Sequence, residues 1–182
     1  ALNLTLHTAA IDGVGPASAI TADRDAQTVT LSFARPIAVG PYKLRVAFSG
    51  AVNKFGRGLF MVDYPTGDGR KRMMSSHLEP ADARRIFPGW DEPVFKASFE
   101  LIVTVPQDFL AVSNMPVTRE EPAGGGLKRV AFAPTPKMSS YLFVLAAGDL
   151  ERATVEADGV TIGVVTTRGK SAGGRYALDT AV

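Results

Sequence analysis

The amino-acid sequence predicts an all-β fold, an antiparallel multi-stranded β-sandwich with saddle-like sheets and at most short helical turns. The 182 residues include 18 glycines and 12 prolines, which interrupt regular structure often. In several segments apolar and polar residues alternate with a period of two, as in half-buried strands. Turn sequences separate these segments, and a helical pattern is confined to the carboxyl end.

The first predicted strand covers residues 2–6, where leucines alternate with polar residues. The turn sequence Asp12-Gly13 leads into a second strand at 17–22, and we expect these two strands to pair. The same alternation predicts strands at 28–33 and 42–48. Residues 1–50 are therefore expected to be entirely strand and turn.

A β-hairpin is predicted for residues 58–64 and 72–77, because the segment between them, PTGDGRK, contains glycines that allow a tight turn. Pro80 can occupy the first position of a short helical turn over Pro80–Arg85, where its missing N–H is not needed. The hairpin therefore runs directly into a loop that begins with one helical turn.

The stretch Met74–Pro93 concentrates residues with special chemistry. It contains two arginines and two adjacent acids whose ion pairs would hold the loop in one shape: Arg84, Arg85, Asp91 and Glu92. Trp90, the only tryptophan in the chain, and Phe87 are expected to pin the loop. A salt-bridged structural loop is thus the simplest interpretation of these charges.

The longest uninterrupted strand is predicted at 97–105. Its odd-numbered positions are apolar and its even-numbered positions are mostly polar, with Ile102 as the exception. Shorter strands at 110–115 and 128–133 flank a flexible loop, EEPAGGG. Residues 141–147, YLFVLAA, are apolar throughout, which predicts a strand covered on both faces.

The carboxyl-terminal part predicts a hairpin of residues 151–157 and 160–167 across Asp158-Gly159. Helix-forming residues then begin at Arg175 and continue to Val182 without a stop signal. We therefore expect a β domain over residues 1–166. Residues 167–182 are expected to form a linker, Thr167–Gly174, and the first helix of a following domain.

Three strings resemble a known family. ARRIFPGWDEPVFKASFELIVTVP, then SNMPV, then SSYLFVLAAGDLE occur in the order found in the amino-terminal domain of the aminopeptidase N family of zinc metallopeptidases. The resemblance covers about Gly58 to Val182, and three motifs in order are far more specific than any one alone. It implies that this chain precedes a zinc-containing catalytic domain. Gly89 departs from the family, which usually has cysteine there.

The resemblance also implies a substrate-binding pair. The family motif TQxE falls on Ser76, His77 and Glu79, and its acid recognises the free α-amine of the peptide substrate while the glutamine position helps line the first side-chain pocket. A carboxylate held near a terminal ammonium gives charge-assisted binding that an internal peptide bond cannot use. Helix capping remains the alternative for Glu79, and an exposed strand position is the alternative for His77.

No catalytic residue is predicted within the chain itself. A zinc peptidase of this type needs an HExxH helix, but the chain has only two histidines, His7 and His77, and no such string. The family's zinc ligands and its GxMEN strand would lie beyond Val182, so we expect the isolated chain to be inactive. The expected partners are its own catalytic domain and the amino terminus of a peptide. The alternative is a freestanding β-sandwich that binds another protein.

Composition narrows the remaining function classes. The net charge is +2 and no run of five like charges occurs, so the sequence does not indicate a nucleic-acid-binding surface. The chain has no cysteine and therefore no disulfide or thiolate metal site. No stretch approaches the roughly 20 apolar residues of a membrane helix. We therefore expect a soluble protein without membrane contact, cytoplasmic or periplasmic, with zinc only in the parent enzyme.

Overall fold

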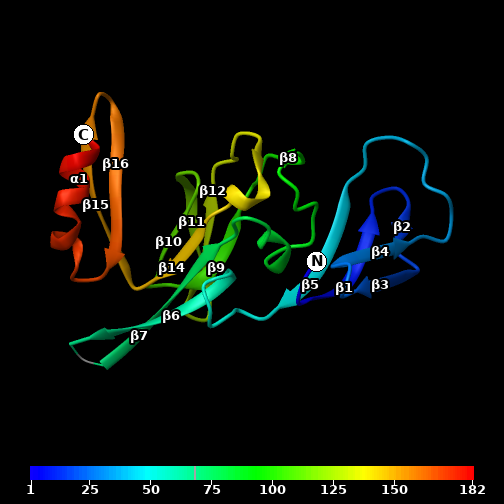
Figure 1. The fold of residues 1–182 in the computed structure, drawn as a ribbon, viewed down its shortest axis with the longest axis horizontal. Coiled ribbons are helices and arrows are strands. Elements are labelled where there is room, and N and C mark those ends of the chain that lie inside the picture. Colours follow the sequence, from blue (N-terminus) through cyan, green and yellow to red (C-terminus); the bar gives the residue numbers. More distant parts are fainter. Residues whose placement is uncertain (68) are drawn as a thin grey trace.

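The computed structural model describes residues 1–67 and 69–182. Strands dominate it, and every pairing between the named strands in the described part is antiparallel, which confirms the predicted all-β class. The sheets follow one another along the long axis of the molecule (Figure 1). The first five strands lie at one end, the β6–β7 hairpin and its neighbours lie in the middle, and β15, β16 and α1 lie at the other end.

The first fifty residues form five strands: β1 (Leu4–Ile11), β2 (Gly15–Pro16), β3 (Ala19–Asp23), β4 (Thr28–Ser32) and β5 (Leu44–Gly50). The expected pairing of the first strand with 17–22 is wrong, because β1 pairs with β2 and β5, whereas β3 pairs with β4. Gly13 and Gly15 have positive φ, so the chain reverses at once and places Gly15 beside Ile11. Pro16 then ends β2, since it has no N–H for the ladder.

The predicted hairpin of the central sheet is confirmed and is longer than expected. β6 (Gly58–Thr66) pairs with β7 (Gly69–His77) in an unbroken register from Gly58–His77 to Thr66–Gly69. The predicted turn includes Asp68, which lies outside the described residues. β7 also pairs with β14 (Leu145–Gly148), which pairs with β10 (Leu110–Ser113).

The single strand predicted at 97–105 is wrong, because it divides into β8 (Lys96–Ala97) and β9 (Ile102–Pro106). Its neighbour at this point carries Pro134 and Pro136, which cannot donate to a ladder. Between them, Thr135 exchanges backbone and hydroxyl hydrogen bonds with Phe99. β8 instead pairs with β13 (Met138–Ser139). The predicted alternation nevertheless holds, since Ile102 is 58% exposed and Val105 is buried.

The EEPAGGG segment is not a flexible loop. Most of it belongs to β11 (Val117–Gly124), which pairs with β12 (Leu127–Phe132), and β12 also pairs with β9. Gly124, Gly125 and Gly126 all have positive φ, so the three glycines concentrate the reversal in a tight turn. The acids before them are then free to continue the strand.

Residues 141–147, predicted to be one strand covered on both faces, also differ from the prediction. Residues 140–142 form a 3₁₀ turn, η2 (Ser140–Leu142), and β14 begins only at Leu145. Leu142 and Val144 are 46% and 43% exposed, whereas Phe143 and Leu145 are buried. One face of this segment therefore packs in the core and the other is open.

The core consists of two groups of buried residues beneath the central strands. One contains residues of β9, β10, β12 and β14: Val105, Ala111, Val130, Phe132 and Ala147. The other joins the end of β7 to η1 (Ala83–Arg85) and β14: Leu78, Ala83, Phe143 and Leu145. The second group lies directly beneath the residues that the sequence predicts to bind substrate.

The carboxyl-terminal hairpin and helix are confirmed. β15 (Leu150–Ala157) pairs with β16 (Val160–Thr167) across Asp158 and Gly159, which both have positive φ. A 3₁₀ turn, η3 (Ser171–Gly174), leads into α1 (Arg175–Ala181). No helix in the described part of the chain has the length and apolar content needed to cross a bilayer.

Helix α1 is held against β16 at a point where only glycine fits. A Cβ added to Gly174 would lie 2.6 Å from a methyl of Val164, whereas one added to Gly173 would meet nothing within 4 Å. We expect Gly174→Ala to lower the free energy of unfolding by about 1–3 kcal/mol through overpacking. Urea denaturation of both alanine variants checks this, with Gly173→Ala as the control. Equal midpoints would contradict the packing.

Candidate functional site

His77 and Glu79 lie at the end of the β6–β7 hairpin. His77 is the last residue of β7, and Glu79 follows in a turn closed by the hydrogen bond from Asp82 N to the Leu78 carbonyl, 2.8 Å. Both side chains are exposed, while Leu78 between them is 2% exposed. The strand ends before Glu79, but the turn still presents the imidazole and the carboxylate at the surface on either side of a buried leucine.

The helix-capping alternative for Glu79 is wrong. The short helical turn expected over Pro80–Arg85 is η1, which begins only at Ala83, and its amino-terminal flanking residue is Asp82. Glu79 therefore has no structural duty at a helix start. His77 occupies an exposed position at the end of a strand, as its alternative interpretation predicts.

Asp82 anchors the turn from beneath. It is 2% exposed, and its carboxylate accepts hydrogen bonds from Arg85 Nε (2.6 Å) and from Arg57 Nε and Nη2 (2.8 and 3.3 Å). Burial acts to raise the pKa of Asp82, but the hydrogen bonds from both guanidinium groups outweigh it, so the pKa lies below its usual value. The turn that carries Glu79 is thereby fixed to both η1 and the segment before β6.

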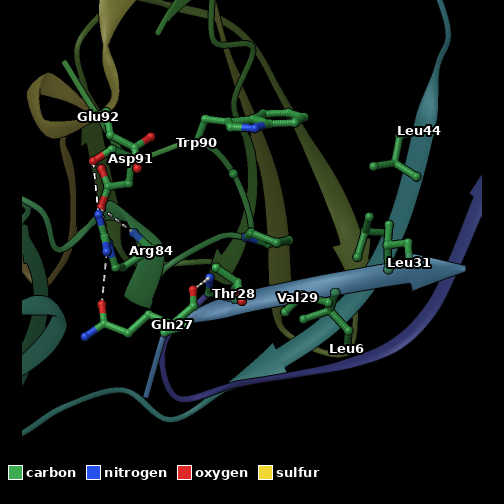
Figure 2. Close-up of a pocket in the computed structure, with 15 residues that line it drawn as sticks. Leu6, Gln27, Thr28, Val29, Leu31, Leu44, Arg84, Trp90, Asp91 and Glu92 are labelled. Atoms are coloured by element: carbon green, nitrogen blue, oxygen red, sulfur yellow. Dashed lines mark hydrogen bonds and ion pairs between the residues drawn. The ribbon is translucent and has the colours of Figure 1, made fainter. Parts of the chain in front are cut away.

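The ion pairs expected in the loop form only in part. Arg84 donates from its backbone N and from Nε to Asp91, at 3.0 and 3.1 Å, and from Nη1 to Gln27 Oε1 (Figure 2). Asp91 also accepts from the buried Ser140 hydroxyl, 2.6 Å. Glu92 is exposed, and Arg85 pairs with Asp82 instead. The structural interpretation of Arg84 and Asp91 is therefore correct.

Trp90 does not pin the loop, because it is 72% exposed. Phe87 does, through contacts with two other phenylalanines: its ring centroid lies 5.8 Å from that of Phe99 and 5.5 Å from that of Phe143, the latter in an edge-on arrangement. Such aromatic pairs add to ordinary apolar burial. The loop is thus fixed by its phenylalanine, while its tryptophan faces solvent.

A second feature of the same loop is a groove of about 300 Å³ that sequence reasoning missed. Figure 2 shows Trp90, Asp91 and Glu92 on one side of it and strand residues on the other. The strand side is apolar: Leu6, Val29, Leu31, Leu44 and Val46. The alternation in β4 and β5 predicted an apolar face there. Nothing in the sequence indicated that this face would line a groove instead of being fully covered.

A charged junction joins the other end of the hairpin to the carboxyl-terminal strands. Asp149, between β14 and β15, accepts hydrogen bonds from Lys71 Nζ (2.6 Å) and Arg168 Nε. The Lys71 ammonium, and after it the Arg168 guanidinium, hold the pKa of Asp149 below its usual value. The ion pairs therefore connect β7, the start of β15 and the end of β16.

The described residues do not offer a metal site. Across residues 1–67 and 69–182, no three histidine, cysteine, aspartate or glutamate side chains come together in a way that could hold a metal ion. Zinc therefore does not fit any group of side chains among these residues.

The family defined as the Peptidase M1 N-terminal domain matches residues 3–142. The chain belongs to this family. The matched residues include β1, the β6–β7 hairpin, His77, Glu79 and η2. The family implies zinc.

Relatives of this M1 N-terminal domain are aminopeptidases. Aminopeptidase N of Acetobacter pasteurianus is 46% identical over 165 residues, which cover 90% of this chain and 46% of that protein. Aminopeptidase M1-A of Oryza sativa subsp. japonica is 42% identical, over 86% of this chain and 18% of its own length. The puromycin-sensitive aminopeptidase of Caenorhabditis elegans is 38% identical, over 84% and 17%. The chain spans less than half the length of each.

Proposed function

We propose that this M1 N-terminal domain caps the active-site cleft of a longer zinc-dependent aminopeptidase and binds the amino terminus of its peptide substrate. In this proposal Glu79 accepts hydrogen bonds from the substrate α-ammonium, and His77 lines the pocket for the first side chain. The metal and the catalytic groups belong to a catalytic domain outside residues 1–182. The domain boundary near residue 167 is part of the same proposal.

One observation carries the proposal: Glu79 is an exposed carboxylate on a turn that the structure fixes rigidly. The buried Asp82 and its two arginines hold the turn, and Leu78 anchors it in the core. A carboxylate held in place before the ligand arrives gains more from an ammonium than a mobile one, because less side-chain and backbone freedom is lost on binding. The names and lengths of the relatives support the aminopeptidase reading over a freestanding binding module.

The test is Glu79→Gln and Glu79→Ala in the intact enzyme. We expect kcat/KM for aminoacyl p-nitroanilides to fall about 100-fold, or about 2.7 kcal/mol, because a charge-assisted bond to the substrate ammonium is lost. Circular dichroism should show an unchanged fold, since the side chain is exposed. Glu100→Gln, another exposed acid, is the control and should retain activity.

Kinetics of both Glu79 variants equal to those of the wild type would end the assignment of this residue. A full-length gene product with no catalytic domain after residue 182 would instead favour the freestanding interaction module.

A further inference from the structure

The dipeptide Asp-Gly occurs three times in the sequence, at residues 12–13, 68–69 and 158–159. An aspartate side chain can close into a ring on the backbone nitrogen of the next residue. Glycine hinders this closure least, because it has no Cβ. Asp68 lies outside the described residues, so the structure compares the first dipeptide with the third. These two differ in how firmly the aspartate is held.

The Asp12 carboxylate is bound through both of its oxygens. Arg45 donates to one oxygen from Nε at 2.9 Å and to the other from Nη2 at 3.1 Å. The hydrogen bond from this guanidinium holds the pKa of the Asp12 carboxyl below its usual value, which keeps the group ionised. The backbone N of Asp12 also donates to the Lys43 carbonyl at 3.0 Å, which ties the turn to the chain just before β5. Both the side chain and the backbone of Asp12 are therefore fixed.

Asp158 is held much less firmly. It forms the two-residue turn of the β15–β16 hairpin with Gly159, at the end of the hairpin that is remote from the central sheets (Figure 1). Both residues are exposed, and the ladder ends at the pair Ala157–Val160. Within residues 1–67 and 69–182, the Asp158 carboxylate makes no hydrogen bond or ion pair. Because this sheet has only two strands, its outer turn can open locally without disturbing the rest of the fold.

We propose that Asp158-Gly159 is a site of spontaneous isoaspartate formation and that Arg45 protects the same dipeptide at Asp12-Gly13. The Gly159 backbone nitrogen attacks Cγ of the neutral Asp158 carboxyl group, and a bond forms between these two atoms. The N–H proton and the carboxyl hydroxyl leave together as one water molecule. Water then adds to a carbonyl of the resulting succinimide ring. When the bond from the nitrogen to the main-chain carbonyl carbon breaks, the product is isoaspartate, with the backbone running through Cγ.

The modification would change the geometry of this hairpin. Asp158 and Gly159 have φ values of 49° and 76°, the left-handed conformation that matches a two-residue turn to the twist of its strands. Isoaspartate adds one carbon atom to the backbone inside that turn. The closing pair Ala157–Val160 is therefore the part of the ladder that the modification disturbs first.

The test is a peptide map of the intact enzyme after prolonged incubation at neutral pH and physiological temperature. Electron-transfer fragmentation distinguishes isoaspartate from aspartate at each position. We expect about tenfold more isoaspartate at position 158 than at position 12, because ring closure depends steeply on the placement of the reacting atoms. Asp158→Asn is the positive control: it fits the same turn and closes to the same ring with loss of ammonia.

Arg45→Gln tests the protection of the other dipeptide. This variant removes the guanidinium from Asp12, so isoaspartate at position 12 should rise about tenfold while position 158 is unchanged. Equal conversion at the two positions of the wild type overturns the proposal. The absence of isoaspartate at position 158 also overturns it, whether or not Asp158→Asn converts. An unchanged position 12 in Arg45→Gln overturns the protective role of the ion pair.

Discussion

Replacing Asp91 with alanine is expected to lower the free energy of unfolding by about 3–5 kcal/mol, the usual cost of removing one partner from a buried ion pair. The Asp91 carboxylate accepts from the backbone and guanidinium of Arg84 and from the Ser140 hydroxyl. Arg84 is only 22% exposed in its side chain, so it cannot recover full hydration. Ser140 is buried and loses a hydrogen-bond acceptor as well.

Urea denaturation of Asp91→Ala beside Glu92→Ala measures this effect. Glu92 is the next acid in the chain but is exposed, so its replacement should change the free energy of unfolding by less than about 0.5 kcal/mol. Similar losses in the two variants would show that the buried network is not what distinguishes the two acids.

The second large effect is expected for Leu145→Ala, with a loss of about 3 kcal/mol from the transfer of buried atoms and the cavity left behind. Leu145 belongs to the core group that lies beneath the Glu79 turn, and it is 7% exposed. Phe143 of the same group packs its ring on Phe87 and Phe99. Large partly buried side chains such as Leu59, Ile86 and Met138 pack against this group, so partial collapse keeps the expected loss toward the lower end of the range for such a substitution.

Leu142→Ala is the matched control because it removes the same atoms from a residue that is 46% exposed. Its loss should stay below about 1 kcal/mol, within the range of surface substitutions. Thermal or urea unfolding of the two variants compares them directly. A comparable loss at both positions would restore the prediction that this apolar segment is covered on both faces.

The parts of the fold that the sequence predicted correctly depend on local signals. The β6–β7 and β15–β16 hairpins are marked by glycine-containing turns between alternating segments, and Asp158-Gly159 adopts the positive φ values that such a turn needs. Helix α1 was predicted from the helix formers that begin at Arg175. In these cases the residues that decide the structure are adjacent in the chain.

The errors come from contacts that a strand pattern does not encode, whether the partner is near or far in the chain. The break between β8 and β9 is caused by prolines 134 and 136, more than thirty residues further on. The partner of Arg85 is Asp82 rather than the Asp91–Glu92 pair, because η1 brings residues three apart together. Trp90 is exposed, whereas Phe87 packs against the core group beneath the loop. A period-two pattern carries no information about any of these contacts.

Only part of the candidate site was predicted from the sequence. A motif resemblance pointed to His77 and Glu79, and the structure shows both to be exposed at the end of one hairpin. Arg57, which donates to the buried Asp82 in the turn of Glu79, was missed. The hairpin register could not have indicated this contact, because the chain before Gly58 folds back and Asn53 pairs in parallel with Phe60.

The β6–β7 hairpin also connects the Glu79 turn to the start of β15. At one end Arg57 and Asp82 fasten the Glu79 turn, and roughly 20 Å along the ladder, at about 3.4 Å per residue, Lys71 is bound to Asp149. A ladder paired over its whole length bends little between those points. Tilting β15 and β16 through Asp149 would therefore move Glu79 as part of the same rigid piece. The direction in which the chain leaves toward α1 and the position of the Glu79 carboxylate are therefore mechanically linked.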